Sequence, residues 1–333
     1  MKSTFFFPIF VAAFCMVLFS CSSSPKKVER VPLPYAMVSE DLFTSFPGTL
    51  IVDKKYIVME DPFAGEGLIK LYDRNTGELV MQTGQTGSGP TDFVTITVHN
   101  VLDGMLLVSD INSAKKAIAQ LDDIPIIKQP FTFSRSEIDA MNRVQLIASE
   151  TYLVMDYFNE NPFIVQNEAG ETVQAPFGKW LIDDAYTDQQ GAFIYCAAKK
   201  AFLYTLSNCA YITMYRQTEK GFEQVWENLL EKPEYRLVDN RIRWGDNQKC
   251  GFMNVAFLKD YIACLRNELL VNESLGRDIS KLPRTVYLFD YNGNLVRICE
   301  LEHPTLRIAG NGESNTLYAI NVPAEYCLVK HEL

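Results

Sequence analysis

The chain has 333 residues and a formal net charge of −10 at pH 7, and 47% of its residues are hydrophobic and 12% aromatic. This composition excludes general disorder and supplies enough apolar side chains for a large core. Because the negative charge repels phosphate backbones, we expect no nucleic acid partner.

The first twenty residues have the pattern of a secretory signal peptide. A cationic start at Lys2 precedes an apolar run over 5–19, which is too short to span a bilayer. The run ends in Leu18-Phe19-Ser20-Cys21, which resembles the lipobox of bacterial lipoproteins. We therefore predict a signal peptide over 1–20, lipidation of the Cys21 thiol, and a flexible tether over 21–27. An ordinary secretory signal and an uncleaved N-terminal helix are the alternatives.

The residues after Cys21 bear on the location of the protein. Ser22 is not the aspartate that retains lipoproteins in the inner membrane of enteric bacteria, so we expect an anchor in the outer membrane. Lys26 and Lys27 stand where surface-exported lipoproteins carry acidic residues. This favours the periplasmic face over the cell surface.

The remaining chain, 28–333, is expected to form one all-β domain, because short apolar or alternating runs are separated by turn residues. A unit of strand, polar turn and returning strand recurs along this part of the chain. Apolar runs that predict further strands precede these units, as at 56–59 and 261–264. The turns stand about 45–51 residues apart with one longer step, a spacing typical of four-stranded propeller blades. They begin at Asp73, Asp122, Asn167, Thr218 and Asp290.

A sixth unit, over 305–330, stops one strand short of a complete blade. The segment Val28–Leu33 is free to supply the missing outer strand, which would close the ring and cover an open sheet edge. The predicted fold is therefore a six-bladed β-propeller of four-stranded blades, closed by an N-terminal strand. Two stacked β-sandwiches are the alternative.

Four segments together resemble the TolB-like six-bladed β-propeller lipoproteins of the Bacteroidales. They are Leu71-Tyr72-Asp73 to Gly77, the glycine-rich 84–93, Tyr287 to Gly293, and Thr316-Leu317-Tyr318-Ala319. The resemblance spans the mature chain but is specific mainly over 49–93 and 252–332. It implies a six-bladed propeller on a lipid anchor, and the family has no established catalytic residues to carry over. Asp92 replaces the glutamate of the usual GxGPxEF form, a conservative change.

The sequence contains no catalytic motif. The glycine-rich 84–90 lacks the Lys-Ser/Thr pair of a phosphate-binding loop and is interpreted as a turn between blades. The histidines, His99, His303 and His331, have neither a GxSxG partner nor zinc-ligand spacing. We predict no catalytic residue, and an enzymatic role is the less favoured possibility.

No cofactor is predicted, but calcium is not excluded. In a propeller, isolated carboxylates from different blades converge on the axial channel, so their spacing in the sequence carries no signal. Asp110, Asp156 and Asp246 are conceivable ligands there.

The mature part contains six cysteines, and the cell envelope permits disulfides. Four of them, Cys196, Cys264, Cys299 and Cys327, stand in apolar strand-like runs, where cysteine serves as a small buried hydrophobe. Cys209 and Cys250 are the other two. The sequence does not define any disulfide pairing among the six cysteines.

Two segments exceed the blade period, Glu231–Cys250 and Val271–Leu282. The first contains Arg241, Arg243 and Trp244, and arginine and tryptophan are among the residue types that dominate binding hot spots. We predict these three as rim-binding residues. The alternative is that Trp244 packs in a core and the arginines pair with surface acids.

These features lead to one functional hypothesis and two rivals. The first is a lipid-anchored, non-catalytic binding or scaffolding module for an envelope protein or glycan. The second is a propeller-type hydrolase or lyase with a metal in the axial channel. The third is a structural subunit of an envelope assembly.

Overall fold

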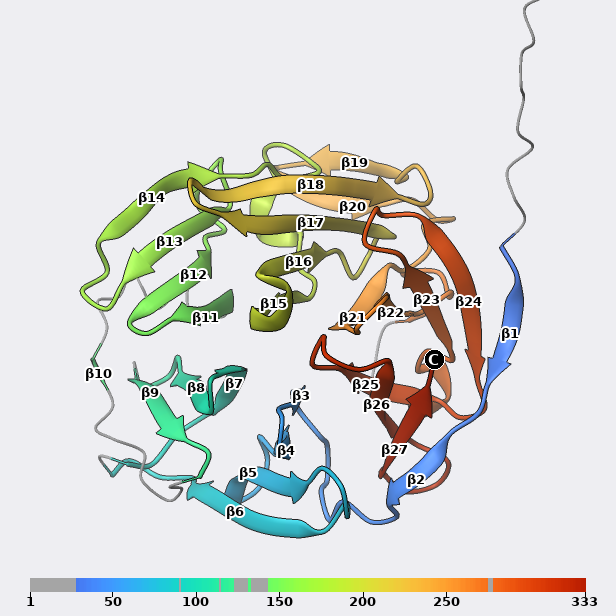
Figure 1. Cartoon of the computed structure of the whole chain (residues 1–333). Helices are drawn as coiled ribbons and strands as arrows, with labels where there is room; N and C mark the ends of the chain where they lie inside the picture. Colours follow the sequence, from blue (N-terminus) through green and yellow to red (C-terminus); the bar gives the residue numbers. More distant parts are fainter. Residues whose placement is uncertain (1–27, 90, 114, 123–130, 133–142, 275–277) are drawn as a thin grey trace, which may run out of the picture.

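The computed structural model describes residues 28–333 except 90, 114, 123–130, 133–142 and 275–277. The predicted signal peptide, Cys21 and the tether lie outside the described residues. Six sheets surround a central axis like the blades of a propeller (Figure 1). The predicted all-β six-bladed propeller is confirmed. No helix within the described part of the chain is long and apolar enough to cross a membrane.

The first four strands of each blade, counted from the axis, run antiparallel, with the first next to the axis and the fourth near the rim (Figure 1). Blade one contains β3 (Leu50–Val52), β4 (Tyr56–Glu60), β5 (Glu66–Asp73) and β6 (Leu79–Gln85). Blade two contains β7 (Thr97–Leu102), β8 (Met105–Asp110), β9 (Lys115–Gln120) and β10 (Phe131–Thr132). Blade three contains β11 (Val144–Ala148), β12 (Thr151–Met155), β13 (Phe163–Asn167) and β14 (Thr172–Phe177).

Blade four contains β15 (Phe193–Cys196), β16 (Ala201–Thr205), β17 (Tyr211–Thr218) and β18 (Gly221–Leu229). Blade five contains β21 (Phe252–Phe257), β22 (Ile262–Arg266), β23 (Thr285–Phe289) and β24 (Leu295–Leu301). Blade six contains β25 (Thr305–Ala309), β26 (Thr316–Asn321) and β27 (Cys327–Glu332). A separate hairpin, β19 (Tyr235–Val238) and β20 (Arg241–Trp244), stands between blades four and five. The connections include the short 3-10 helices η2 (Tyr186–Asp188), η3 (Ala197–Lys199) and η4 (Ile279–Lys281).

Four of the predicted hairpin turns, which begin at Asp73, Asn167, Thr218 and Asp290, join the third strand of a blade to its fourth strand. The turn predicted at Asp122 follows β9, but residues 123–130 lie outside the described part of the chain. In the first, Asp73 Oδ1 accepts hydrogen bonds from the backbone of Asn75 at 2.8 Å and Thr76 at 2.9 Å. Gly77 closes this turn with φ +75°, and a Cβ there would lie 2.0 Å from the Val38 carbonyl oxygen. Only glycine fits that position.

The core consists of layers between neighbouring blades. Middle strands such as β22 and β23 are buried along their whole length, because each face packs against an adjacent blade. The layer between blades three and four is rich in aromatic rings, including Phe163, Phe202 and Tyr204. Such layers stabilise the ring only when every blade has two neighbours, which makes closure of the ring energetically important.

An N-terminal strand closes the ring, as predicted, but the prediction that Val28–Leu33 supplies it was wrong. β2 (Ala36–Ser39) pairs antiparallel with β27 and completes blade six. β1 (Arg30–Leu33) instead pairs in parallel with β24, as a fifth strand of blade five. Pro32 in β1 has no N–H and is tolerated because β1 is an edge strand. Both strands follow the outer rim (Figure 1).

Polar side chains bridge every pair of neighbouring blades near the axis. Each reaches a backbone group on or beside an inner strand of the next blade. In order around the ring, the bridges are Glu60 to Val98 N (3.4 Å), Asn100 to Leu146 N (2.9 Å), Gln145 to Tyr195 N (3.0 Å), Thr205 to Phe252 O (3.4 Å), Asn254 to Ile308 N (2.7 Å) and Arg307 to Gly48 O (2.7 Å).

The two faces of the disc differ in their connections. In an antiparallel meander, the links from second to third strand and from one blade to the next lie at one end of the strands, which we call the loop face. The links from first to second and from third to fourth strand lie at the other end, the turn face. The connections 40–49, 86–96, 178–192, 230–251 and 267–284 lie on the loop face. The connection 121–130, of which the structure describes only 121 and 122, joins the third strand of blade two to its fourth strand on the turn face.

Candidate functional site

The predicted rim residues lie on the β19–β20 hairpin of the loop face. The two strands pair from Tyr235 opposite Trp244 to Val238 opposite Arg241. Asp239 and Asn240 form the two-residue turn with φ of 51° and 56°. These residue types tolerate the left-handed conformation that such a tight hairpin requires. The hairpin therefore presents Arg241, Arg243 and Trp244 from one short strand.

The structure gives the three predicted residues different environments. Arg241 Nη2 lies 2.7 Å from Asp188 Oδ1, so it has a partner within the chain, as the alternative anticipated. Arg243 is exposed. Trp244 is half-buried and packs beside Ile182 and Ile242, so only part of its ring is available to a ligand. The structure brings the three residues together, and no observation tests their role in binding.

The two segments that exceed the blade period lie side by side. Cys250 N donates to Leu269 O at 2.9 Å, and Val271 N donates to Gln248 O at 2.9 Å. Gln248 is buried and donates through Nε2 to the backbone carbonyl of Asn208 at 3.0 Å. These contacts hold the two segments against each other on the loop face.

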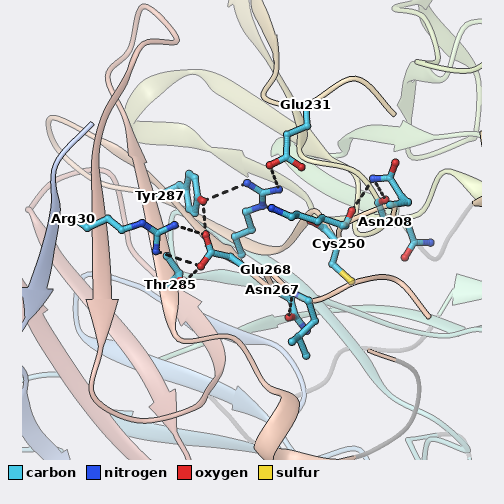
Figure 2. A network of polar contacts seen from close by, with 12 residues as sticks. Arg30, Asn208, Glu231, Cys250, Asn267, Glu268, Thr285 and Tyr287 are labelled. Carbon is cyan, nitrogen blue, oxygen red and sulfur yellow. Dashed lines mark hydrogen bonds and ion pairs between the residues drawn. The ribbon is translucent and has the colours of Figure 1, made fainter. Parts of the chain in front are cut away.

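A polar network connects this region to β1 (Figure 2). Arg30 Nη2 donates to Glu268 Oε1 at 2.6 Å, and the Tyr287 hydroxyl donates to the same oxygen at 2.6 Å. Burial raises the pKa of Glu268, but the hydrogen bonds from Arg30 and Tyr287 outweigh it, so the pKa is lowered and the group is ionised. The buried Arg266 donates to the Tyr287 hydroxyl at 3.3 Å and lies 3.0 Å from Glu231. The network therefore fixes the start of the 231–250 segment.

Exposed apolar side chains are distributed unequally between the faces. The loop connections carry Phe43, Phe63, Val94, Phe158, Tyr235, Leu237, Val238 and Ile279. The other exposed large hydrophobic residues lie on outer strands, apart from Met253 on β21. None lies in a described connection of the turn face.

Phe43 is the most exposed of these side chains, at 80%, and the backbone around it is unusual. Its φ is +43°, a conformation that is costly for a bulky residue. The buried Lys70 fixes the loop by donating to Phe43 O at 2.8 Å and to Asp61 Oδ2 at 2.8 Å. A strained aromatic residue held towards solvent by a buried ion pair is a candidate contact site. The sequence alone does not reveal it, because the strain and the exposure come from tertiary structure.

The glycine-rich segment connects β6 to β7, which confirms that it is a turn between blades. Asp92 accepts hydrogen bonds from Gln85 Nε2 at 2.7 Å and Gly89 N at 2.9 Å. The bond from Gln85, followed by that from Gly89, lowers the pKa of the Asp92 carboxyl. A Cβ on Gly87 would lie 2.3 Å from Asp92 Oδ2, so a larger residue there would require the Asp92 carboxylate to move.

The three aspartates considered for an axial metal have separate surroundings. Asp110 is buried, and its oxygens accept hydrogen bonds from Val94 N at 2.6 Å and Ser113 Oγ at 2.5 Å. Asp156 accepts from Phe158 N at 2.9 Å in a loop, and Asp246 is exposed beyond the hairpin. In the described ranges, no three His, Cys, Asp or Glu side chains are grouped so that they could hold a metal ion.

All six described cysteines are free and buried. Burial raises the pKa of every one of these thiols, including Cys299 to about 11, so they remain protonated. The interpretation of Cys196, Cys264, Cys299 and Cys327 as small buried hydrophobes is confirmed.

The fold has counterparts among solved structures. A protein of Bacteroides fragilis NCTC 9343 described as exported matches with a TM-score of 0.61 and 9% identity, over 91% of this chain and 97% of that one. U3-55K matches with a TM-score of 0.52 and 12% identity, over 90% and 98% of the two chains. The RRP9 WD40 repeats match with a TM-score of 0.51 and 12% identity, over 92% and 99%. At these identities the matches show the propeller fold alone. No protein-family model and no curated protein matches the chain.

Proposed function

We propose that the protein is a TolB-like propeller lipoprotein, anchored through Cys21 in the outer membrane on its periplasmic face. The lipobox over 18–21 and the polar tether support this assignment. The described chain joins the ring at the outer edge of blade five through β1, so a lipid on the preceding segment attaches at the rim and leaves the centre of both faces free (Figure 1).

The loop face binds an envelope protein or glycan, without catalysis. The observation that carries this proposal is the concentration of exposed apolar side chains in the loop connections and their absence from the described turn connections. The free energy falls when a partner covers exposed apolar side chains of this kind and removes them from water. The hairpin with Arg241, Arg243 and Trp244 is part of the same face.

A photo-crosslinking amino acid placed in cells at position 63 or 237 tests the proposal. Both positions are exposed on the loop face, and position 75, exposed on the turn face, is the matched control. We expect defined crosslinked products from 63 and 237 and none from 75. Equal products from all three positions, or products from 75 alone, would contradict the assignment of the loop face.

Metal analysis tests the rival hydrolase or lyase, which requires a metal in the axial channel. The full chain, purified in detergent, should contain less than stoichiometric calcium, and its melting temperature should shift little with calcium, magnesium or zinc. A stoichiometric calcium ion with a large stability increase would favour the rival hydrolase or lyase, because a ligand that binds only the folded state stabilises it by mass action.

A further inference from the structure

The strongest unassigned feature is a cavity of about 490 Å³ on the loop face, beside the β19–β20 hairpin. Three parts of the chain form it: the connection from blade three to blade four, the link between β16 and β17, and β20. Its lining is mainly polar and consists of Thr187, Asp188, Gln190, Asn208, Arg241, Ile242, Arg243 and Trp244.

One side of the cavity is held in place by Asp188. Its carboxylate accepts from Arg241 Nε at 2.9 Å and from Ile242 N at 2.7 Å, and it lies 2.7 Å from Arg241 Nη2. The Asp188 side chain is only 13% exposed, so this pairing is partly protected from water. Arg241 is therefore a positioning residue, and its charge is neutralised locally.

Other polar groups of the lining have no partner. In the part of the chain that the structure describes, the side chains of Thr187, Gln190, Asn208 and Arg243 make no hydrogen bond and no ion pair; Gln190 and Asn208 use only their backbone carbonyls. A hydroxyl, two carboxamides and a guanidinium therefore remain available to a ligand. Because Asp188 neutralises Arg241, Arg243 leaves the cavity with a net positive charge.

Trp244 adds a rigid apolar wall. It contacts the small cluster of Ile182, Ala185 and Ile242, and its ring lies 6.3 Å from that of Tyr235 in an edge-on arrangement. An indole fixed in this way offers apolar area with little entropy left to lose on binding.

We propose that this cavity binds an acidic saccharide, a sugar chain that carries carboxylates. Carboxamides and hydroxyls match the hydroxyl groups of a sugar, and the indole matches its apolar ring face. The unpaired guanidinium of Arg243 matches a carboxylate, which arginine binds in a bidentate manner. The inference rests on the proposed function and specifies its ligand.

The test uses the full chain in detergent and a panel of uronic acid oligosaccharides, composed of glucuronate, galacturonate, mannuronate or guluronate, measured by calorimetry. Neutral oligosaccharides of the corresponding hexoses and polyglutamate are the comparison ligands. We expect binding to at least one uronate, at least tenfold weaker binding to its neutral counterpart, and no comparable binding to polyglutamate.

Variants identify the cavity as the site. Arg243→Gln and Asn208→Ala should each weaken uronate binding at least tenfold, and neither removes a side chain that the described part of the chain uses in a hydrogen bond. Arg216→Gln, at an exposed position on β17 and outside the lining, is the matched control and should bind as the unaltered chain does. Failure to bind any uronate, unchanged binding by Arg243→Gln, or equal binding of polyglutamate would overturn the proposal. Loop-face crosslinks that persist in such a case would leave the proposed function standing and exclude only the saccharide.

Discussion

Asn100 shows how single polar residues hold neighbouring blades together. Its Nδ2 donates to Leu146 O at 2.8 Å and its Oδ1 accepts from Leu146 N at 2.9 Å, in a buried position. Asn100→Ala leaves both backbone groups unpaired, so we expect a loss of about 2–4 kcal/mol in the free energy of unfolding, measured with urea. Asn292→Ala, at an exposed turn, should stay within about 0.5 kcal/mol. A similar small loss for Asn100→Ala would refute the bridging role.

His99 makes stability depend on pH. Burial, and secondarily Arg143, lowers its pKa from 6.5 to about 3, and it is hydrogen-bonded to Ser109 at 2.7 Å. Between these pH values the unfolded chain binds a proton that the folded chain excludes. Stability therefore falls as pH drops from about 6.5 towards 3, by at most about 1.4 kcal/mol per pH unit for this group. In urea titrations at several pH values, His99→Gln should show a shallower slope; identical slopes would mean that His99 is charged in the folded state.

At the scale of elements, the two N-terminal strands differ in role: β2 closes the ring in blade six, and β1 adds a fifth strand to blade five. A chain that begins at Pro34 lacks β1 and the Arg30–Glu268 pair but keeps β2, so we expect a closed monomeric ring with reduced stability. A chain that begins at Glu40 also lacks β2 and exposes the edge of β27, so we expect loss of cooperative unfolding and association through that edge. Thermal unfolding and size-exclusion chromatography measure both outcomes. If the chain that begins at Glu40 is monomeric and as stable as the chain that begins at Pro34, β2 does not close the ring.

The elements differ in how far the sequence reveals them. The hairpin turns were predictable, because Asp73 and Gly77, or Asp290 and Gly293, are required by local backbone geometry. The closing strand was misplaced by several residues, because parallel pairing of β1 with β24 depends on distant partners such as Glu268. The β19–β20 hairpin was recognised only as excess length. Its cavity was not predictable, since Asp188 and Asn208 come from other connections.

At the scale of the whole molecule, the two faces differ in their exposed apolar side chains, and no local sequence pattern reveals this difference. Alternation of strands places five long connections, 40–49, 86–96, 178–192, 230–251 and 267–284, on one face, and only tertiary structure decides which apolar side chains remain exposed there. The net charge of the chain is likewise a sum over all its surfaces and does not describe any one of them. Arg243 lies within an acidic protein, yet its own surroundings in the cavity are positive.

Phe43 tests whether the loop face was shaped for contact rather than for stability. Phe43→Asn places a residue that tolerates positive φ where a bulky one is strained, and the lost side chain is 80% exposed. We therefore expect the free energy of unfolding to stay equal or rise by up to about 1 kcal/mol. Crosslinking from position 63 should nevertheless fall several-fold, because Phe63 and Phe43 belong to the same face. Val173→Thr, at an exposed outer strand, should leave crosslinking unchanged. If Phe43→Asn destabilises the ring and leaves the crosslinks intact, the strained aromatic serves the fold and not a partner.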